Sequence, residues 1–279
     1  MKVIGIDFTS SPSRTKPLTC MHCTFDGWIL RARRLESWPD FGGFEDALDK
    51  PGPWIAGIDF PFGQSRIFIE NIGWPDNWAG YVAHAGSLGR PGFRAALDDY
   101  RRQRRFGDKE HRRKTDIAAS SISPQKLYGV PVGLMFFEGA PRLLKSGVTI
   151  PMLSAGDPRR IVVEAYPGVL ARQLVGRAGY KNDIARKQTE IQHQTRRAML
   201  DNLLRGKLEA RYDLRVEASR TLADDPSGDQ LDALLCAIQA AWAWTMREFH
   251  YGAPRDADPL EGWMADPTLR DKEATISPL

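Results

Sequence analysis

The tetrapeptide Gly-Ile-Asp-Phe occurs twice in the sequence, at residues 5–8 and 57–60, and each copy ends a short apolar run. Continuous apolar runs of this length are typical of strands that are buried on both faces of a sheet. Asp7 and Asp59 therefore each follow directly on a buried strand. Because open α/β sheets place their chemistry at the carboxyl ends of strands, the repeat predicts an α/β fold with a site at one end of its sheet.

The segment between the two copies predicts a hairpin. Residues 18–25 and 28–35 have the composition of strands, and they flank Asp26-Gly27. This dipeptide is typical of a two-residue type I′ turn, because glycine readily adopts the positive φ that the turn needs. We therefore expect two antiparallel strands after the first strand.

The second copy is reached through a helix. Residues 44–48 show a short helical pattern, and the apolar run 54–58 follows it. A strand reached through a helix is most simply parallel to its neighbour in the sheet. If the strands that end at Asp7 and Asp59 are neighbours, their carboxylates lie about 5 Å apart, which is the spacing between strands.

The second half of the sequence predicts further elements of both kinds. A third buried strand is expected at 160–165, with helices at 167–176 and 183–205. Residues 226–249 then predict a long helix whose apolar stripe faces the sheet. Its small residues allow close packing, and they are Ala233, Ala237, Ala240 and Ala241.

Residues 62–155 interrupt this alternation and are expected to form an insertion. The chain has 279 residues, 42% of them hydrophobic, which is enough for one domain with a sizeable core. The later half of the insertion is rich in proline, glycine and serine, so we expect loops that partly cover one edge of the sheet. We assign residues 1–267 to one domain and expect 268–279 to be disordered.

Three further carboxylates are expected near Asp7 and Asp59. Asp229 and Asp232 are three residues apart in the first turn of the long helix, hence on one face, and Glu164 lies on the third strand. Like charges this close repel unless a cation lies between them, and hard carboxylate oxygens favour Mg²⁺ or Mn²⁺ over zinc. The simpler alternative is that these acids only cap turns and helix ends.

Four motifs, in this order, resemble a known family. They are GIDF from residue 5, GIDFPFG from residue 57, EAYPGVLAR from residue 164 and GDQLDALLCAIQAAWA from residue 228. Over about 1–60 and 160–265 the sequence resembles the domain of unknown function 429 family, predicted RNase H-like nucleases, and more distantly the RuvC-type resolvases. The resemblance implies an RNase H-like fold, in which helices flank a mixed sheet of an antiparallel meander plus parallel strands.

The resemblance also implies a two-metal nuclease site. Asp7 would bridge two metal ions, Asp59 would complete one coordination sphere, and Asp232, helped by Asp229, would hold the other. The ions would activate a water for in-line attack on a phosphodiester. These four aspartates are the candidate catalytic residues and, with Glu164, the candidate metal ligands. The resolvases carry glutamate where this sequence has Asp59, which changes the expected metal spacing.

Positive charge is concentrated in one block of the sequence. Residues 101–114 hold eight lysines and arginines against two acids, whereas the whole chain has a net charge of +4. With the aromatic residues upstream, the block predicts a groove for single-stranded nucleic acid; the alternative is a solvated helix surface. The candidate substrate-binding residues are Arg14 and Arg66, each seven residues after an aspartate of the repeat, Arg101 and Arg105 in the block, and Lys181 and Arg197, which match basic positions of the family.

The three cysteines predict a reduced, cytoplasmic protein. Cys20 and Cys23 lack a second ligand pair and would point to opposite faces of a strand, so free thiols are expected rather than a zinc site. The five histidines show no i, i+4 pairing, which argues against a histidine-based metal site. No leader-like start and no run of 18 apolar residues is present, so no membrane association is expected.

Two other functions stay open at this point. The sugar-kinase and actin-like fold also begins with a strand that ends in aspartate and a Thr/Ser-rich turn, as in residues 7–11. That fold would imply an ATP-dependent phosphotransferase, and it needs a second hairpin after Asp59. A non-catalytic RNase H-like module would instead bind nucleic acid or a partner protein, with salt-sensitive binding that persists in EDTA.

Overall fold

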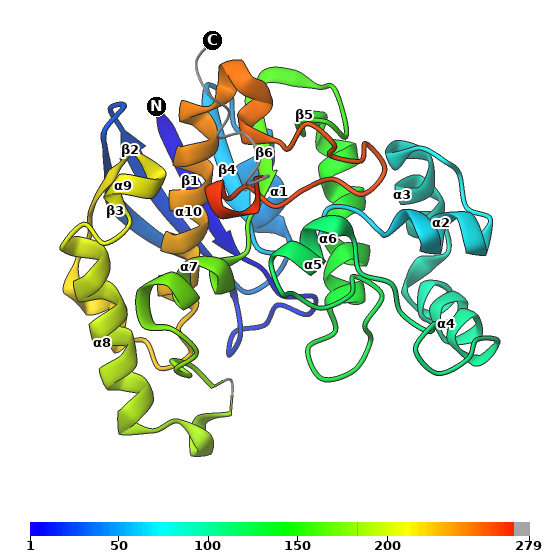
Figure 1. The fold of residues 1–279 in the computed structure, drawn as a ribbon, viewed down its shortest axis with the longest axis horizontal. Helices are drawn as coiled ribbons and strands as arrows, with labels where there is room; N and C mark the ends of the chain where they lie inside the picture. Colours follow the sequence, from blue (N-terminus) through cyan, green and yellow to red (C-terminus); the bar gives the residue numbers. More distant parts are fainter. Residues whose placement is uncertain (183, 271–279) are drawn as a thin grey trace, which may run out of the picture.

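The computed structural model describes residues 1–182 and 184–270, which form a seven-stranded mixed sheet flanked by helices (Figure 1). The strand order is β5-β6-β4-β1-β2-β3-β7. The strands are β1 (Lys2–Asp7), β2 (Leu18–Phe25), β3 (Ile29–Trp38), β4 (Trp54–Ile58), β5 (Val148–Thr149), β6 (Asp157–Glu164) and β7 (Arg215–Glu217). The α-helices are α1 (Gly42–Asp49), α2 (Arg66–Ile72), α3 (Trp78–Ser87), α4 (Gly89–Arg102), α5 (Lys114–Ala118), α6 (Val132–Ser146), α7 (Pro167–Val175), α8 (Glu190–Leu204), α9 (Glu209–Tyr212) and α10 (Asp229–Thr245).

The pairing of the central strands confirms the expected mixed sheet. Strands β1, β2 and β3 form an antiparallel meander, whereas β4 is parallel to β1 and β6 is parallel to β4. The expected type I′ turn is wrong, because Gly27 has a positive φ of 110° but Asp26, the other central residue of that turn, does not have a positive φ. The Asp26 carboxylate instead accepts hydrogen bonds from the backbone N–H groups of Trp28 and Ile29.

Helix α2, rather than the second hairpin of a kinase-like or actin-like fold, follows the second copy of the repeat.

The glycines of the two repeat copies make room for α10. Gly5 and Gly57 are paired across β1 and β4, and α10 crosses both strands. A Cβ atom on Gly5 would lie 1.9 Å from the carbonyl oxygen of Ala233, and one on Gly57 would lie 2.3 Å from that of Cys236. The helix backbone therefore rests directly on the sheet. This contact confirms the close approach that the alanines predict, and it explains why each aspartate is preceded by Gly-Ile.

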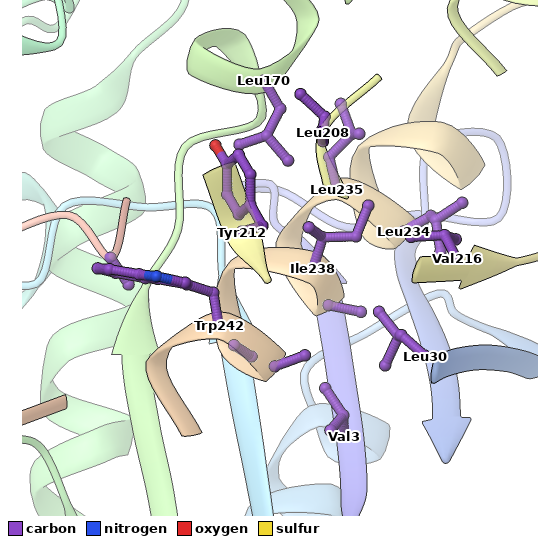
Figure 2. Close-up of a cluster of buried hydrophobic side chains, with 14 of the residues drawn as sticks. Val3, Leu30, Leu170, Leu208, Tyr212, Val216, Leu234, Leu235, Ile238 and Trp242 are labelled. Carbon is purple, nitrogen blue, oxygen red and sulfur yellow. The ribbon is translucent and has the colours of Figure 1, made fainter. Parts of the chain in front are cut away.

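Two hydrophobic layers enclose the sheet. On one face, α7, α8 and α10 pack against the strands, and Figure 2 shows part of this cluster, from Val3 and Leu30 to Leu234 and Trp242. On the other face, Ile4 and Ile58 belong to a second cluster that is completed by α1 and by helices of the insertion. The insertion thus supplies most of a core layer.

The expectation of loops in the later half of the insertion is partly wrong. Helix α6 has 15 residues there and contains Pro141. A proline inside a helix removes a hydrogen bond and crowds the preceding turn. Burial of Leu134, Phe136, Ala140 and Leu143 on α6 outweighs this cost. Strand β5, at the edge of the sheet next to β6, also was not expected.

The remaining elements agree with the sequence except at their ends. Helix α7 matches the expected 167–176, but α8 begins only at Glu190, after a 3₁₀ turn at Ala185–Lys187, and residue 183 lies outside the described part of the chain. Strand β7 was not expected. The disorder predicted for 268–279 is wrong for 268–270, because a 3₁₀ turn spans Pro267–Leu269 and Asp266 caps it; 271–279 lie outside the described residues. No helix in the described ranges has the length and apolarity that crossing a membrane requires.

Candidate metal and phosphodiester site

Asp7 and Asp59 lie side by side at one end of the sheet. Asp7 is the last residue of β1, and Asp59 directly follows β4. Ile6 and Ile58 are register partners, and the Asp59 N–H donates to the Ile6 carbonyl oxygen at 3.0 Å. Both aspartates are half-buried. The repeat therefore brings two carboxylates to one place, as the parallel pairing predicts.

Helix α10 brings the second pair of aspartates to the same place. Asp229 and Asp232 lie in its first turn, and their residues are only 8% and 1% exposed. Contact of the helix backbone with Gly5 fixes this turn relative to the end of β1. Buried acids at a helix N-terminus are stabilised by the helix dipole, but here they also face other carboxylates.

The electrostatics confirm that the four carboxylates act on one another. Burial raises the pKa of Asp7 well above its ordinary value, and the charges of Asp232, Asp229 and Asp59 add to the rise. Burial and the Asp232 charge raise the pKa of Asp59 to about 7. Burial likewise raises the pKa of Asp229. Clustered carboxylates that share so little positive charge are typical of functional sites.

Lys181 and Tyr180 lie next to the four aspartates and contact Asp232. The Lys181 ammonium forms an ion pair with Oδ2 of Asp232, and the Tyr180 hydroxyl donates to Oδ1 at 2.7 Å. Burial alone would lower the pKa of Lys181, but Asp232 and Asp7 outweigh it, and the pKa is raised well above its ordinary value. The same ammonium charge opposes the pKa rise at Asp7, Asp59 and Asp229. We call these five residues, Asp7, Asp59, Asp229, Asp232 and Lys181, the aspartate cluster.

In the described part of the chain, no three of the four aspartates bring their oxygens together at one point. Among the described residues, the set of three possible ligand atoms that all lie within 4.8 Å of one another is formed by Cys20, His22 and Glu36. That set comes together across β2 and β3, where Cys20 and Glu36 are register partners, so histidine spacing along the sequence does not reveal it. His22 Nε2 lies 2.9 Å from Glu36 Oε2, and Arg34 also pairs with Glu36.

The cysteines behave as the sequence predicts. Cys20, Cys23 and Cys236 are free and buried. Cys20 packs in the cluster on one face of the sheet and Cys23 in the cluster on the other. Burial raises the pKa of both strand thiols, which disfavours the thiolate that a metal would need.

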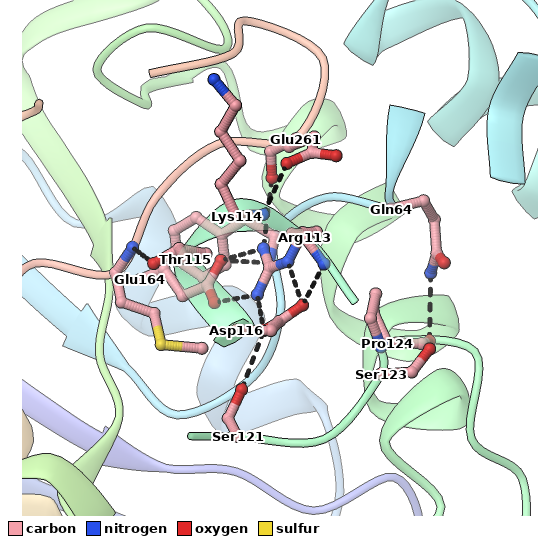
Figure 3. A network of polar contacts seen from close by, with 12 residues as sticks. Gln64, Arg113, Lys114, Thr115, Asp116, Ser121, Ser123, Pro124, Glu164 and Glu261 are labelled. Carbon is pink, nitrogen blue, oxygen red and sulfur yellow. Dashed lines mark hydrogen bonds and ion pairs between the residues drawn. The ribbon is translucent and has the colours of Figure 1, made fainter. Parts of the chain in front are cut away.

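Glu164 lies next to Asp59 in the sheet but has different partners. Its two oxygens accept from the Arg113 guanidinium at 2.7 and 2.5 Å, and one also accepts from the Phe62 N–H at 2.8 Å. Arg113 also binds Asp116, and its side chain is fully buried (Figure 3). Burial raises the pKa of Glu164, and Arg113 opposes that rise. The structure thus assigns Glu164 to a buried ion-pair network instead of an open ligand position.

The basic block does not form an aromatic groove. Arg113 is the most buried basic residue of 101–114. Neither expectation for this block, a solvated surface or a groove, includes a buried arginine. Of the other basic residues, Arg101 lies near Asp98 and Glu110, Arg104 binds Asp108, and Arg105 is exposed. Upstream aromatics of the block are mostly core residues, namely Trp78, Tyr81, Phe93 and Tyr100, with Trp74 half-buried and Phe106 fully exposed.

The other basic candidates lie in different places. Arg66 binds the Asp258 carboxylate at 2.6 and 2.7 Å, and Arg197 on α8 lies 3.7 Å from Asp224. Arg14 is exposed in the segment between β1 and β2. Among these basic candidates, in the part of the chain that the structure describes, Lys181 is the one that forms an ion pair with one of the four aspartates.

A cavity of about 290 Å³ opens beside the aspartate cluster, with Asp59 and Lys181 at its rim. Its wall is largely apolar and includes Phe60, Ile122, Val130, Val132, Met135 and Met264. Its polar side includes Arg113, Asp116 and Ser121, which bind one another or Glu164. Sequence reasoning missed this cavity, because residues 121–135 of the insertion meet the ends of β4 and β6 only in the folded chain.

Comparison with known proteins gives one kind of match. No curated protein and no solved structure matches the chain significantly. A family profile, described as "Protein of unknown function (DUF429)", matches residues 5–255, which include all four aspartates and Lys181. Because the match covers most of the chain, the protein belongs to the DUF429 family.

Proposed function

We propose that this protein is a metal-dependent phosphodiesterase that acts on nucleic acid. The observation that carries the proposal is the convergence of Asp7, Asp59, Asp229 and Asp232 at one end of the sheet, where burial raises the pKa values of Asp7, Asp59 and Asp229. Acids that merely cap turns would be solvated and far apart. The alternative of simple capping therefore does not account for the shared electrostatics.

The donor set fits a hard divalent cation. Its ligand atoms are carboxylate oxygens, which select Mg²⁺ or Mn²⁺; Asp7 and Asp59 would hold the ion, with Asp229 and Asp232 adding negative charge beside it. The negative charge exceeds what Lys181 alone neutralises, so a bound cation would be stabilised by the cluster. When bound, Mg²⁺ or Mn²⁺ lowers the pKa of a coordinated water and stabilises the leaving oxygen of a phosphodiester.

The chain's own groups prepare the site for this chemistry. Tyr180 and Lys181 fix the Asp232 carboxylate, because each contacts one of its two oxygens. The α10 backbone, seated on Gly5 and Gly57, holds the helix aspartates against the strand aspartates. Placement of carboxylates on rigid elements is what a precise ligand geometry requires.

The cavity beside Asp59 supports a nucleotide as the substrate unit. Its wall is apolar, and its buried charges already satisfy one another, so it favours an uncharged group. We propose that it receives the base next to the scissile phosphate, with the phosphate at the aspartate cluster. The three free, buried cysteines agree with the reduced cytoplasmic compartment that we also propose.

Cleavage by an Asp7→Asn variant tests the proposal. Fluorescent single-stranded and duplex DNA and RNA would be incubated with Mn²⁺, and the variant should lose at least roughly 10³-fold in rate, the order expected for removing a group that stabilises transition-state charge. The matched control is Asp46→Asn, which changes an exposed aspartate of α1 and should keep full activity. Cleavage that survives Asp7→Asn, or the absence of cleavage of all four substrates by the unaltered protein, would contradict the proposal.

A further inference from the structure

We infer that the Lys181 ammonium takes the place of one of the two metal ions expected at the site, so that each chain binds one divalent cation rather than two. This inference rests on the proposed function, because it concerns the same carboxylates. It changes the expected two-metal arrangement, in which Asp232 would hold a second ion.

Both oxygens of Asp232 already have partners from the chain. Oδ2 pairs with the Lys181 ammonium, and Oδ1 accepts from the Tyr180 hydroxyl. The Asp232 residue is 1% exposed, whereas the Lys181 side chain is 36% exposed. A second divalent ion on Asp232 would have to displace the Lys181 ammonium or the Tyr180 hydroxyl from a buried carboxylate. Loss of a partner from a buried carboxylate is unfavourable.

Lys181 is held in place by contacts along its backbone and side chain. The Tyr180 carbonyl oxygen accepts from the buried Arg196 guanidinium at 2.8 Å, and the Lys181 carbonyl oxygen accepts from the Gln192 side-chain amide at 3.2 Å. The side-chain stem packs on Gly228, where a Cβ atom would lie 2.9 Å from the Lys181 Cβ. Gly228 has a φ of 77° and directly precedes α10. The lysine is therefore built into the site by α8 and by the start of α10.

The arrangement separates the carboxylates into two pairs with different partners. Asp7 and Asp59 follow paired strands and, within residues 1–182 and 184–270, accept no hydrogen bond from a cationic side chain, whereas Asp232 binds Lys181. No three of the four aspartates have oxygens that all lie within 4.8 Å of one another among the described residues. The strand pair is thus the position for a divalent cation. The ammonium, a compact charge with three donors, can contact a phosphate oxygen from the other side.

The number of Mn²⁺ ions per chain tests the inference without an activity measurement. The unaltered protein, titrated with Mn²⁺ and followed by electron paramagnetic resonance of the free ion, should bind one ion. Lys181→Met keeps most of the stem length but removes the charge, and it should bind two. Lys181→Arg keeps the charge and should bind one. The control is Lys187→Met, which changes an exposed lysine of the same segment and should also bind one.

The possible outcomes separate this inference from the proposed function. Two ions in the unaltered protein would overturn the inference and leave the phosphodiesterase proposal standing. Binding of one ion by a folded Lys181→Met variant would overturn the inference as well. If the unaltered protein binds no Mn²⁺ at millimolar concentration, the proposed function itself fails. Should Lys181→Met not fold, the counts for the unaltered protein and Lys181→Arg still decide the question.

Discussion

Two buried charge clusters lie at the same end of the sheet, and they are built on opposite principles. In the first, Glu164 and Asp116 share the guanidinium of Arg113, and every one of these groups has several hydrogen bonds. In the second, the aspartate cluster, four carboxylates share one ammonium. Glu164 and Asp59 end neighbouring strands, since Ile58 and Glu164 are register partners. Two acids at the ends of neighbouring strands therefore differ in their access to a cation. Glu164 contacts the Arg113 guanidinium directly, whereas Asp59 shares the Lys181 ammonium with three other aspartates.

The two clusters differ in how far their negative charges are neutralised. The Arg113 network joins α5 of the insertion to β6, and Arg113 also donates to the Glu261 carbonyl oxygen near the C-terminal end. One guanidinium faces two carboxylates there, so the network is closer to neutral than the aspartate cluster and has less use for an added cation. The aspartate cluster keeps an excess of negative charge, which costs stability in the isolated chain and stabilises a bound cation.

The largest expected effect comes from breaking the Arg113 network. Arg113→Met replaces the guanidinium with an apolar side chain of similar length. Glu164 and Asp116 then stay buried without their cation. Loss of one partner of a buried ion pair costs about 3–5 kcal/mol of unfolding free energy. Urea denaturation should show this decrease. A loss below about 1 kcal/mol would mean that the network does not anchor the insertion to the sheet.

The pH dependence of stability should reveal the unbalanced cluster. The pKa of Asp59 is raised from its ordinary value near 4 to about 7, so the folded state holds a proton that the unfolded state releases. Stability in EDTA should therefore fall as pH rises from about 4 to about 7, by at most about 4 kcal/mol from this group, since one pKa unit is worth about 1.4 kcal/mol.

A variant isolates the contribution of Asp59 from that of other titrating groups. Asp59→Asn removes the titration, so thermal midpoints measured from pH 4 to 8 should show a smaller fall than in the unaltered protein. Burial lowers the pKa of His111, which acts in the opposite direction because stability from a neutral histidine grows as pH rises. Parallel pH curves for the two proteins would contradict the assignment of the raised pKa to Asp59.

A smaller effect is expected from the glycines that seat α10. Gly5→Ala would push a methyl group into the Ala233 carbonyl, and backbone shifts of this kind typically cost about 1–3 kcal/mol. The shift also moves Asp229 and Asp232 away from Asp7, so Mn²⁺ affinity should fall. Gly73→Ala is a useful control, because nothing lies within 4 Å of its Cβ position, although its positive φ adds a cost of its own. Unchanged Mn²⁺ binding in Gly5→Ala would show that α10 does not position the helix aspartates.

The sequence predicts those parts of the site that depend on local pattern. Asp7 and Asp59 follow apolar runs, and Asp229 and Asp232 follow from helical spacing, so their meeting place can be inferred from strand order. Lys181 is found only through the family resemblance, because nothing in its own segment marks it. The Arg113–Glu164 pair joins residues 51 positions apart through the fold of the insertion, which no periodicity reveals. In α6, burial of an apolar stripe overrides the proline signal at Pro141.

The smallest effects provide the most direct contrast, because the same chemical change should have opposite signs in the two clusters. Glu164→Gln replaces one of the two oxygens that accept from Arg113 with an NH₂ group that cannot accept, so a buried hydrogen bond is lost and stability should fall by about 1–3 kcal/mol. Asp7→Asn removes a charge from the aspartate cluster and relieves repulsion. In EDTA the thermal midpoint should therefore stay equal or rise, and the free energy of unfolding should rise by at most about 1 kcal/mol. Chemical denaturation of both variants at pH 8, where the acids of the unaltered protein are most ionised, gives the comparison. Destabilisation of both variants by similar amounts would mean that Asp7, like Glu164, is held by a structural partner. The excess of negative charge at the end of β1 would then not distinguish the two clusters.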